Sequence, residues 1–311
     1  MMAQKILRGF FWSFLSAFLW GTTYLAGRAL MRDGGEIDPV TLSLIRFSGA
    51  GALMLAVGGI SGRKMFAFSR LDFLRMVCQG MIGMAGMSLF IFWGQQTTSA
   101  VNSSMIMTAV PVLILLGGLL TGEKITPGQW IGMAVATVGC GIVIGVVTPA
   151  GVRFDAFRPG DLLTFGAAVC WTVYTLWGRR TVPRVGGYVY TTWVMLGAVP
   201  LLALLALLRP GSAALPGALP GWLLVGYITV FPTAVAFFAW NEAQRLIGLP
   251  LLNIMQYLTP VTVLVLSWPL LGEGFSLFQL AGAVLVLLGV GLDPSFLPHR
   301  KRPPENEEHP A

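Results

Sequence analysis

The sequence predicts an all-α integral membrane protein whose ten transmembrane helices form two inverted five-helix repeats. Its composition, an internal duplication and the distribution of its basic residues indicate this fold. Of the 311 residues, 55% are hydrophobic and only 11% are charged, and the mean hydropathy is +0.76. These values lie outside the usual range of soluble globular domains, so we expect most of the chain to sit in lipid.

Ten long apolar runs follow one another along the chain. A helix needs about 20 mostly apolar residues to cross roughly 30 Å of hydrocarbon. The first run follows Lys5 and Arg8, but it is too long for the apolar region of a signal peptide, so we expect it to be retained as a helix. The predicted helices cover residues 9–30, 39–60, 72–93, 100–121, 127–147, 160–179, 188–208, 220–240, 249–271 and 276–296.

The second half of the chain repeats the first. Pro111 corresponds to Pro260 at an offset of 149 residues, and Trp20 corresponds to Trp171 at an offset of 151. A duplicated membrane unit implies a pseudo-twofold molecule with a site where the two halves meet. The other matching pairs are Gly122 and Gly272, Glu123 and Glu273, Gln129 and Gln279, Gly132 and Gly282, and Gly139 and Gly289.

The duplication and the charges together predict the topology. Residues 1–150 form the first five-helix repeat, residues 151–298 form the second, and residues 299–311 form a polar tail that we expect to be disordered. With the amino terminus in the cytoplasm, 14 Lys and Arg residues fall on the cytoplasmic side and 5 on the other, which predicts that both termini are cytoplasmic. Because each half has an odd number of helices, the second half is inverted.

Ionisable residues suited to catalysis are missing from the middle of the predicted helices. All 13 acidic residues lie at helix ends, in loops or in the tail, and both histidines lie in the tail. A proton pump, an intramembrane protease and a histidine-ligated metal site each need such groups within the membrane. We therefore predict no catalytic residue, no enzyme activity, no metal and no cofactor. The net charge of +7 arises from basic loops, so we expect no nucleic-acid partner.

Arg46 is the single basic residue in a predicted helix that lies away from the helix ends. It lies seven residues after Pro39, which places it roughly 10 Å from the outer end of the second helix. Two interpretations remain open. Arg46 binds a substrate carboxylate, or it is a structural residue that extends toward the interface or pairs with carbonyls at a broken helix end.

Two repeat-related helices carry matching polar faces that lead to prolines. A polar stripe that faces lipid is unfavourable, so we expect both stripes to line a cavity between the repeats, with hydrogen bonds between helices as the alternative. Pro111 and Pro260 are candidate hinges, with a static kink as the alternative. The two faces, by i, i+3, i+4, i+7 spacing, consist of Ser104, Met107, Thr108 and Pro111 and of Asn253, Gln256, Tyr257 and Pro260.

The candidate substrate-binding residues are aromatic, polar but uncharged, or thioether side chains within the helices. Aromatic rings supply stacking and cation–π surfaces, amides bind amino and carboxylate groups, and methionines fit around apolar groups. For each residue alone, packing or a place in the interfacial aromatic belt is the alternative. The candidates are Trp20, Thr23, Tyr24, Gln79, Met84, Trp93, Asn102, Met107, Trp171, Tyr174, Asn253, Gln256 and Tyr257.

The duplicated Pro-Val, Gly-Glu and Gln-x-x-Gly series resembles the EamA-type permeases of the drug/metabolite transporter superfamily, over residues 9–296. Within that superfamily the pattern of Trp20, Trp171, Tyr174 and Gln79 looks most similar to the YddG-type exporters of aromatic amino acids. The resemblance implies the drug/metabolite transporter fold. Arg46 also matches an arginine common early in the second helix of the family, which favours its structural interpretation.

These observations together predict a secondary transporter or facilitator in the bacterial inner membrane. It would export small neutral or zwitterionic metabolites, above all aromatic and other neutral amino acids, by alternating access through a central cavity. A nucleotide-sugar or phosphate-ester transporter, a transporter of organic cations (drugs) and a non-transporting membrane scaffold are the alternatives. A phosphate site needs several embedded basic groups, whereas Arg46 stands alone. We expect a monomer surrounded by membrane lipid, with a dimer as the alternative.

Overall fold

A computed structural model of the chain is mostly helical. It describes residues 2–31, 37–120, 127–143, 146–152, 158–209, 215–243, 246–247, 258–272, 274 and 276–291. Between the two halves, the strands β1 (Val147–Thr148) and β2 (Gly151–Val152) pair antiparallel in a short hairpin. The prediction of an all-α chain is therefore confirmed apart from this small hairpin.

The helices follow the predicted runs closely. Their bounds differ from the predicted ones by a few residues, and the predicted run 249–271 is described from residue 258 onward. In the first half the elements are α1 (Met2–Met31), α2 (Pro39–Ile60), α3 (Arg70–Gln79), the π-helix η2 (Gly80–Gly86), α4 (Met87–Gln95), α5 (Ala100–Ile106), the 3₁₀-helix η3 (Met107–Ala109), α6 (Val110–Leu120) and α7 (Pro127–Val143).

The second half contains α8 (Pro159–Val185), α9 (Gly187–Leu208), α10 (Leu219–Ile228), the π-helix η5 (Thr229–Val235), α12 (Leu258–Leu271) and α13 (Leu277–Gly291). Residues 236–243 continue the helix after η5. Among the residues that the structure describes, four helical stretches are long and apolar enough to cross a membrane: Pro39–Ile60, Arg70–Gln95, Gly187–Leu208 and Leu219–Ala243. Many large apolar side chains on the outside of the molecule are exposed, as expected for a surface that faces acyl chains.

Local sequence signals explain where several helices begin. The Asp38 side chain accepts hydrogen bonds from the backbone N–H groups of Val40 (2.9 Å) and Thr41 (3.2 Å), and a proline opens α2. Ser69 and Ser99 cap α3 and α5 in the same way. A side-chain oxygen before a helix satisfies backbone donors that have no partner within the helix, so these residues fix the helix starts.

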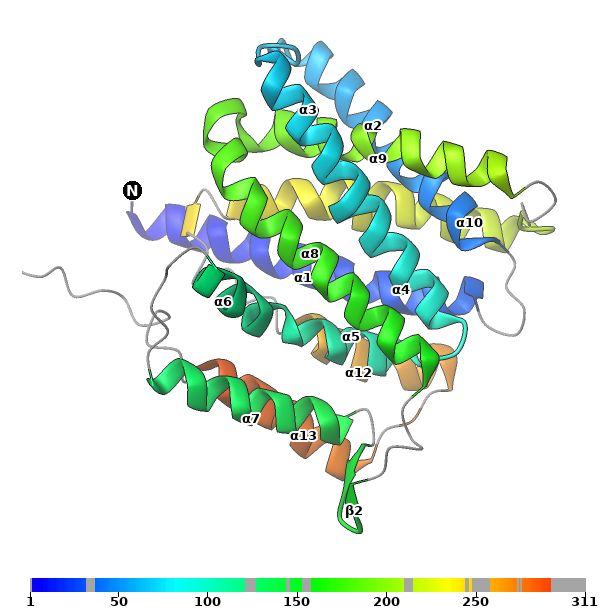
Figure 1. The fold of residues 1–311 in the computed structure, drawn as a ribbon. Coiled ribbons are helices and arrows are strands. Elements are labelled where there is room, and N and C mark those ends of the chain that lie inside the picture. Colours follow the sequence, from blue (N-terminus) through cyan, green and yellow to red (C-terminus); the bar gives the residue numbers. More distant parts are fainter. Residues whose placement is uncertain are drawn as a thin grey trace, which may run out of the picture.

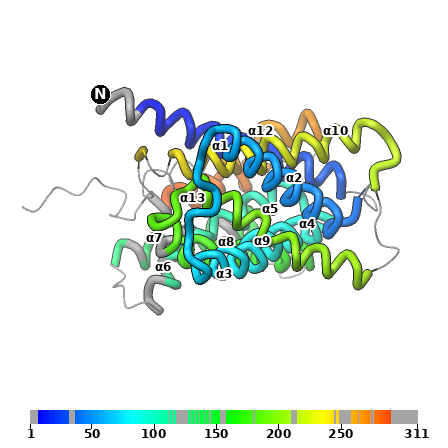
Figure 2. Tube along the Cα trace, turned by 90° about the horizontal axis from the view of Figure 1, so that it is seen from above, coloured from blue at the N-terminus to red at the C-terminus, as the bar shows by residue number. Residues whose placement is uncertain are grey.

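Helices of the two halves interleave. The ribbon shows α2, α3 and α9 together at the top and α7 beside α13 at the bottom (Figure 1). Seen from above, α1, α10 and α12 lie toward one edge, and α3, α6 and α8 lie toward the other (Figure 2). The second-half helix α8 packs against α4 and α6, and α12 packs against α1 and α5. The core therefore forms between the halves rather than within each half alone.

The pair α7 and α13 crosses at glycines of the duplicated series. A Cβ atom added to Gly139 would lie 2.7 Å from the carbonyl oxygen of Gly282, and one added to Gly282 would lie 2.9 Å from that of Gly139. The Gln279 side chain donates a hydrogen bond of 2.9 Å from Nε2 to the Val143 carbonyl. Small residues let the two backbones approach closely, which is a common way to pack helices in lipid.

Two π-helices occupy equivalent places in the two halves. The start of η5 lies 149 residues after the start of η2, the offset that also relates Pro111 to Pro260. In η5, Pro232 has no N–H to donate to the carbonyl of Ile228, and the Thr233 hydroxyl donates to that carbonyl instead, at 2.7 Å. In η2, the glycines at positions 80, 83 and 86 let the backbone adopt the widened turn. π-turns of this kind occur frequently at functional sites.

We expect the substitution Gly139→Ala to destabilise the protein by about 1–3 kcal/mol, because the added methyl group meets the backbone of α13. Thermal unfolding of the detergent-solubilised protein measures the change. Gly226→Ala is the matched control, since a Cβ at this exposed glycine of α10 has nothing within 4 Å. Equal midpoints for the two variants would contradict close packing of α7 on α13.

Candidate functional site

A pocket lies where helices of both halves meet. Its empty space, counting the part that is open to the outside, is about 750 Å³. Most of its wall is apolar. The lining residues are Trp20, Thr23, Tyr24, Arg46, Met87, Ile91, Ser104, Met107, Thr108, Trp171, Phe237, Thr259 and Pro260.

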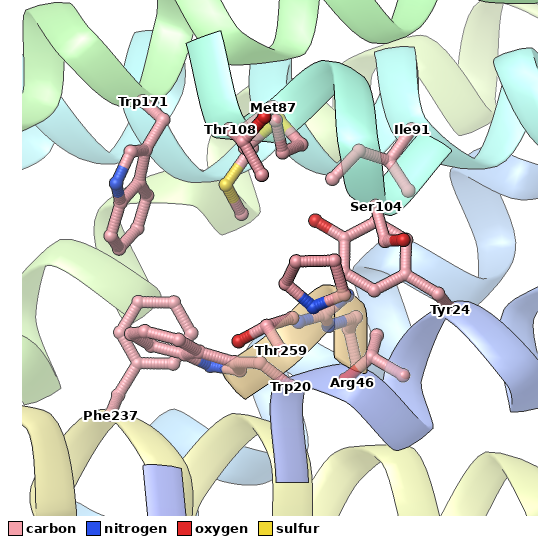
Figure 3. A pocket seen from close by; sticks show the side chains of 13 residues that line it. Trp20, Tyr24, Arg46, Met87, Ile91, Ser104, Thr108, Trp171, Phe237 and Thr259 are labelled. Atoms are coloured by element: carbon pink, nitrogen blue, oxygen red, sulfur yellow. The ribbon is translucent and has the colours of Figure 1, made fainter. Parts of the chain in front are cut away.

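Aromatic rings form one wall of the pocket. The ring centroid of Trp20 lies 5.6 Å from that of Trp171 and 5.2 Å from that of Phe237, and both pairs are close to perpendicular. Figure 3 shows Trp171 and Phe237 on one side of the opening, with Tyr24 and Arg46 on the other. Edge-to-face packing holds these rings in fixed orientations and leaves ring faces for a planar ligand. Trp20 and Trp171 are also the tryptophans that the duplication relates to each other.

Arg46 places a buried positive charge at the pocket. Only 4% of the residue is exposed, and its Nε donates a hydrogen bond of 3.0 Å to the hydroxyl of Thr233 in η5. Its guanidinium carbon lies 4.8 Å from the ring centroid of Phe47 and 5.4 Å from that of Phe92. Within the described parts of the chain no carboxylate forms an ion pair with Arg46. Because a buried charge is unfavourable without a partner, this guanidinium is suited to an anionic group in the pocket.

Four pocket hydroxyls have already donated their hydrogen. They belong to Thr23, which donates to the Leu19 carbonyl at 3.3 Å, Ser104, to the Val101 carbonyl at 2.8 Å, Thr108, to the Met105 carbonyl at 2.5 Å, and Thr259, to the carbonyl of residue 17 in α1 at 3.1 Å. A hydroxyl carries a single hydrogen, so any further bond to these oxygens must come from a donor on the ligand. The pocket therefore combines one strong donor, Arg46, with several acceptors.

Polar contacts tie the helices together beside the pocket. The Gln95 side chain donates a hydrogen bond of 3.0 Å to the Tyr24 carbonyl, and Arg28 donates to the Gln95 carbonyl. Nearby, the Thr98 hydroxyl donates to Asp161 at the start of α8. These bonds join α1, the end of α4 and α8, so they hold elements of both halves together at this end of the molecule.

Comparison with protein families identifies the chain. The EamA-like transporter family matches residues 7–145 and again residues 158–292, which together make up most of the sequence. The chain belongs to the EamA-like transporter family. The resemblance inferred from the duplicated motifs is thereby confirmed, and the family domain occurs once in each half.

Relatives of this EamA-like transporter include proteins named as exporters. The chain is 27% identical over 282 residues to a probable terminal-alkyne amino-acid exporter of Streptantibioticus cattleyicolor, covering 89% of this chain and 90% of that protein. It is 25% identical over 287 residues to the aromatic amino acid exporter YddG of Ancylobacter novellus, covering 89% and 93%. A solved crystal structure matches this chain with a TM-score of 0.66 and 24% sequence identity. The match covers 93% of this chain and 96% of the chain in that structure. The chain is thus a multi-pass membrane transporter of small molecules.

The pocket of this EamA-like transporter contains some of the predicted substrate-binding residues and not others. Those that line it are Trp20, Thr23, Tyr24, Met107 and Trp171, together with Arg46 and the candidate hinge Pro260. Those that do not line it are Gln79, Met84, Trp93, Asn102 and Tyr174. Asn253, Gln256 and Tyr257 lie outside the described residues, as does the side chain of Pro111. The hinge role of the two prolines stays a prediction.

The residues that miss the pocket do so for local reasons. Tyr174 lies one turn beyond Trp171 on α8, and its ring stacks on that of Tyr190 at a centroid distance of 5.7 Å. Gln79 and Met84 are fully buried among α3, η2, α8 and α9. The extra residue in the π-turn of η2 rotates everything after it by about 100° relative to an uninterrupted α-helix. Met87, the first residue after η2, lines the pocket, whereas Met84 lies within η2 and does not.

Six lining residues were not among the predicted ones. Ser104 and Thr108 belong to the polar face that the sequence indicates, and Thr259 directly precedes Pro260, so a signal for these three was present. Phe237 stands beside Phe238 in an apolar run and carries no sequence signal that separates the two. The six are Met87, Ile91, Ser104, Thr108, Phe237 and Thr259.

We expect Thr233→Val to lower the stability by about 1–3 kcal/mol, because Arg46 loses its acceptor and the Ile228 carbonyl loses its donor. Thermal unfolding in detergent measures this effect. Thr229→Val in the same π-helix is the control, because it removes one bond from the hydroxyl to the Val225 carbonyl and leaves Arg46 untouched. If both variants unfold at the same temperature, the anchoring of Arg46 by η5 is wrong.

Proposed function

We propose that this protein exports zwitterionic amino acids with aromatic or other apolar side chains across the bacterial inner membrane. It acts as a secondary transporter or facilitator with ten transmembrane helices in two inverted repeats, and both termini lie in the cytoplasm. The observation that carries the proposal is the division of the pocket into a cationic donor, a set of acceptor hydroxyls and an aromatic wall.

The cargo carboxylate binds Arg46. A guanidinium presents a planar array of donors that matches the two oxygens of a carboxylate, and burial strengthens the interaction. Arg46 keeps its orientation through the bond from Nε to Thr233, which leaves the rest of the guanidinium for the cargo. This assignment gives Arg46 the first of the two roles considered for it, the binding of a substrate carboxylate, and its bond to Thr233 also joins α2 to η5.

The cargo ammonium binds hydrogen-bond acceptors of the pocket. An ammonium has three hydrogens to donate, and the oxygens of Thr23, Ser104 and Thr259 can only accept. The indole faces of Trp20 and Trp171 add cation–π attraction. A zwitterion therefore finds partners for both of its charges, although the described lining has no carboxylate to hold the amine.

The cargo side chain occupies the apolar part of the pocket. Trp20, Trp171 and Phe237 offer stacking surfaces, and Met87 and Ile91 offer adaptable aliphatic ones. A charged cargo side chain would lose its hydration there without gaining a partner, so the pocket selects neutral apolar side chains. Two relatives that are named as amino-acid exporters support the same cargo class.

The contacts between repeat-related elements support a twofold relation of the two halves, and the odd number of predicted helices in each half makes that relation an inverted one. The ring of Trp20 packs against that of Trp171, and α7 crosses α13 at Gly139 and Gly282. The two π-helices begin 149 residues apart, at equivalent places in the two halves. Elements related by a twofold axis touch one another only near that axis. Alternating access by movement of the two halves about a site on the axis is the mechanism typical of such folds.

The strongest competing cargo is an aromatic carboxylic acid without an amine, which the single cation of the pocket would also accept. Phosphate esters and nucleotide sugars fit less well, because they need several basic groups and Arg46 alone lines the described pocket. An organic cation would be repelled by Arg46. A non-transporting scaffold does not need a pocket with a cationic donor on one side and acceptor hydroxyls on the other.

Vesicles with purified protein and an internal supply of labelled tryptophan test the proposal. We expect efflux well above that of protein-free vesicles, and slower movement of tryptamine, which lacks the carboxylate, and of indole-3-propionate, which lacks the amine. Equal rates for tryptophan and indole-3-propionate would replace the amino-acid assignment with that of an organic anion. Efflux no faster than from protein-free vesicles would remove the cargo class altogether.

The variant Arg46→Gln should reduce tryptophan efflux about 10- to 100-fold, since a charge-assisted hydrogen bond contributes roughly 1.5–3 kcal/mol. Arg46→Lys should restore part of the activity because the charge remains. Arg63→Gln, a change at an exposed arginine after α2, is the control and should transport normally. Normal efflux by a folded Arg46→Gln variant would return this arginine to a purely structural role.

A further inference from the structure

A second polar site lies away from the cargo pocket, among α3, α8 and α9. Gln79 and Thr181 have no exposed surface, and Tyr190 is 1% exposed. Both polar atoms of the Gln79 amide, the Thr181 hydroxyl and the Tyr190 hydroxyl have no hydrogen-bond partner within the described part of the chain. We propose that these three side chains bind ordered water, independently of which cargo the transporter carries.

Helix contacts place the side chains of Gln79 and Tyr190 at the same height along the packed helices α3, α8 and α9. The chain from α3 to α4 runs antiparallel to α8: a Cβ on Gly83 would lie 2.5 Å from that of Tyr174, and Arg184 forms a 2.6 Å ion pair with Asp72. Between these two contacts, Gln79 stands opposite Gly178. A Cβ on Gly178 would in turn lie 2.7 Å from the hydroxyl oxygen of Tyr190, so this hydroxyl reaches the level of Gln79.

The other contacts agree with this placement. Thr181 follows Gly178 by three residues and so lies on the same face of α8. Gly80, the neighbour of Gln79, is in close contact with the carbonyl of Val194, which lies one turn after Tyr190 on α9. Side chains from three helices that contact one another, α3, α8 and α9, therefore converge on one small volume.

The chemistry of the three side chains fits a neutral ligand that both donates and accepts. The amide of Gln79 offers two donors and one acceptor site, and the hydroxyls of Thr181 and Tyr190 can do either. A buried water typically makes two to four hydrogen bonds to groups that lack partners. The described groups of the site are a neutral amide and two neutral hydroxyls, and such groups suit water better than an ion.

The place of this water site in the fold indicates its use. The π-helix η2 begins directly after Gln79, and glycines bring α3 and η2 close to α8 and α9 along this seam. If α3 and the α8–α9 hairpin move apart, their polar groups exchange a shared water for other waters rather than breaking direct bonds. Bound water thus lets a tightly packed contact open and close without leaving polar groups unpartnered.

Radiolytic labelling in ¹⁸O water tests for water at this site in the full-length protein. X-ray pulses convert bound water to hydroxyl radicals, which modify the side chains beside it. We expect Tyr190 to incorporate ¹⁸O although it is buried, whereas the fully buried Phe47 and Phe92 serve as controls and should stay unmodified. Labelling of Tyr190 no greater than that of the two phenylalanines would overturn the proposal.

A pair of variants gives an independent answer. If water joins Gln79 to its neighbours, Gln79→Leu removes hydrogen bonds and lowers the unfolding midpoint by about 2–4 °C or more. If the site is dry, the same change removes an unpartnered amide and the midpoint stays the same or rises, which would contradict the proposal. Met84→Leu, a volume-conserving change in the same buried segment, is the control for packing alone.

Discussion

The structure depends on one constraint: inside lipid, every polar group must find its partner within the protein. Most hydroxyls in the helices meet it by donating to a backbone carbonyl one turn earlier, as Thr172 and Thr192 do. Pro232 breaks this regularity, and the Thr233 hydroxyl compensates by donating to Ile228 while accepting from Arg46. One local irregularity in the second half thereby holds the buried charge of the first half.

The same constraint explains the character of the pocket. Hydroxyls that have donated to the backbone turn only lone pairs toward the cavity, so a lining of Thr and Ser becomes an acceptor surface without any buried carboxylate. Arg46 supplies the opposite polarity from a single residue. The pocket can therefore distinguish the two ends of a zwitterion although its walls are mostly apolar. Selectivity follows from the direction of hydrogen bonds more than from net charge.

Features that depend on regular periodicity were predictable from the sequence, and features that depend on a break in periodicity were not. Apolar run lengths and the duplication indicated the helices, and the paired tryptophans Trp20 and Trp171 indicated the pocket. The π-turn in η2 changes the helical register, and Met87 rather than Met84 lines the pocket; the glycines of this segment permit such a turn but do not specify it. Gln79 shows the converse. Its amide signalled a polar site, but only the packing of α8 and α9 shows that this site is separate from the pocket.

Cargo binding must affect both halves at once, because neither half encloses the pocket alone. Arg46 and Tyr24 come from the first half, whereas Trp171, Phe237 and Thr259 come from the second. A ligand can shift a conformational equilibrium only through its different affinities for the two states. Under the proposed function, an amino acid that engages Arg46 at one end and the second-half rings at the other would have its best contacts with the halves closed around it. The arrangement of donor, acceptors and rings would then link recognition of the proposed cargo to movement of the repeats.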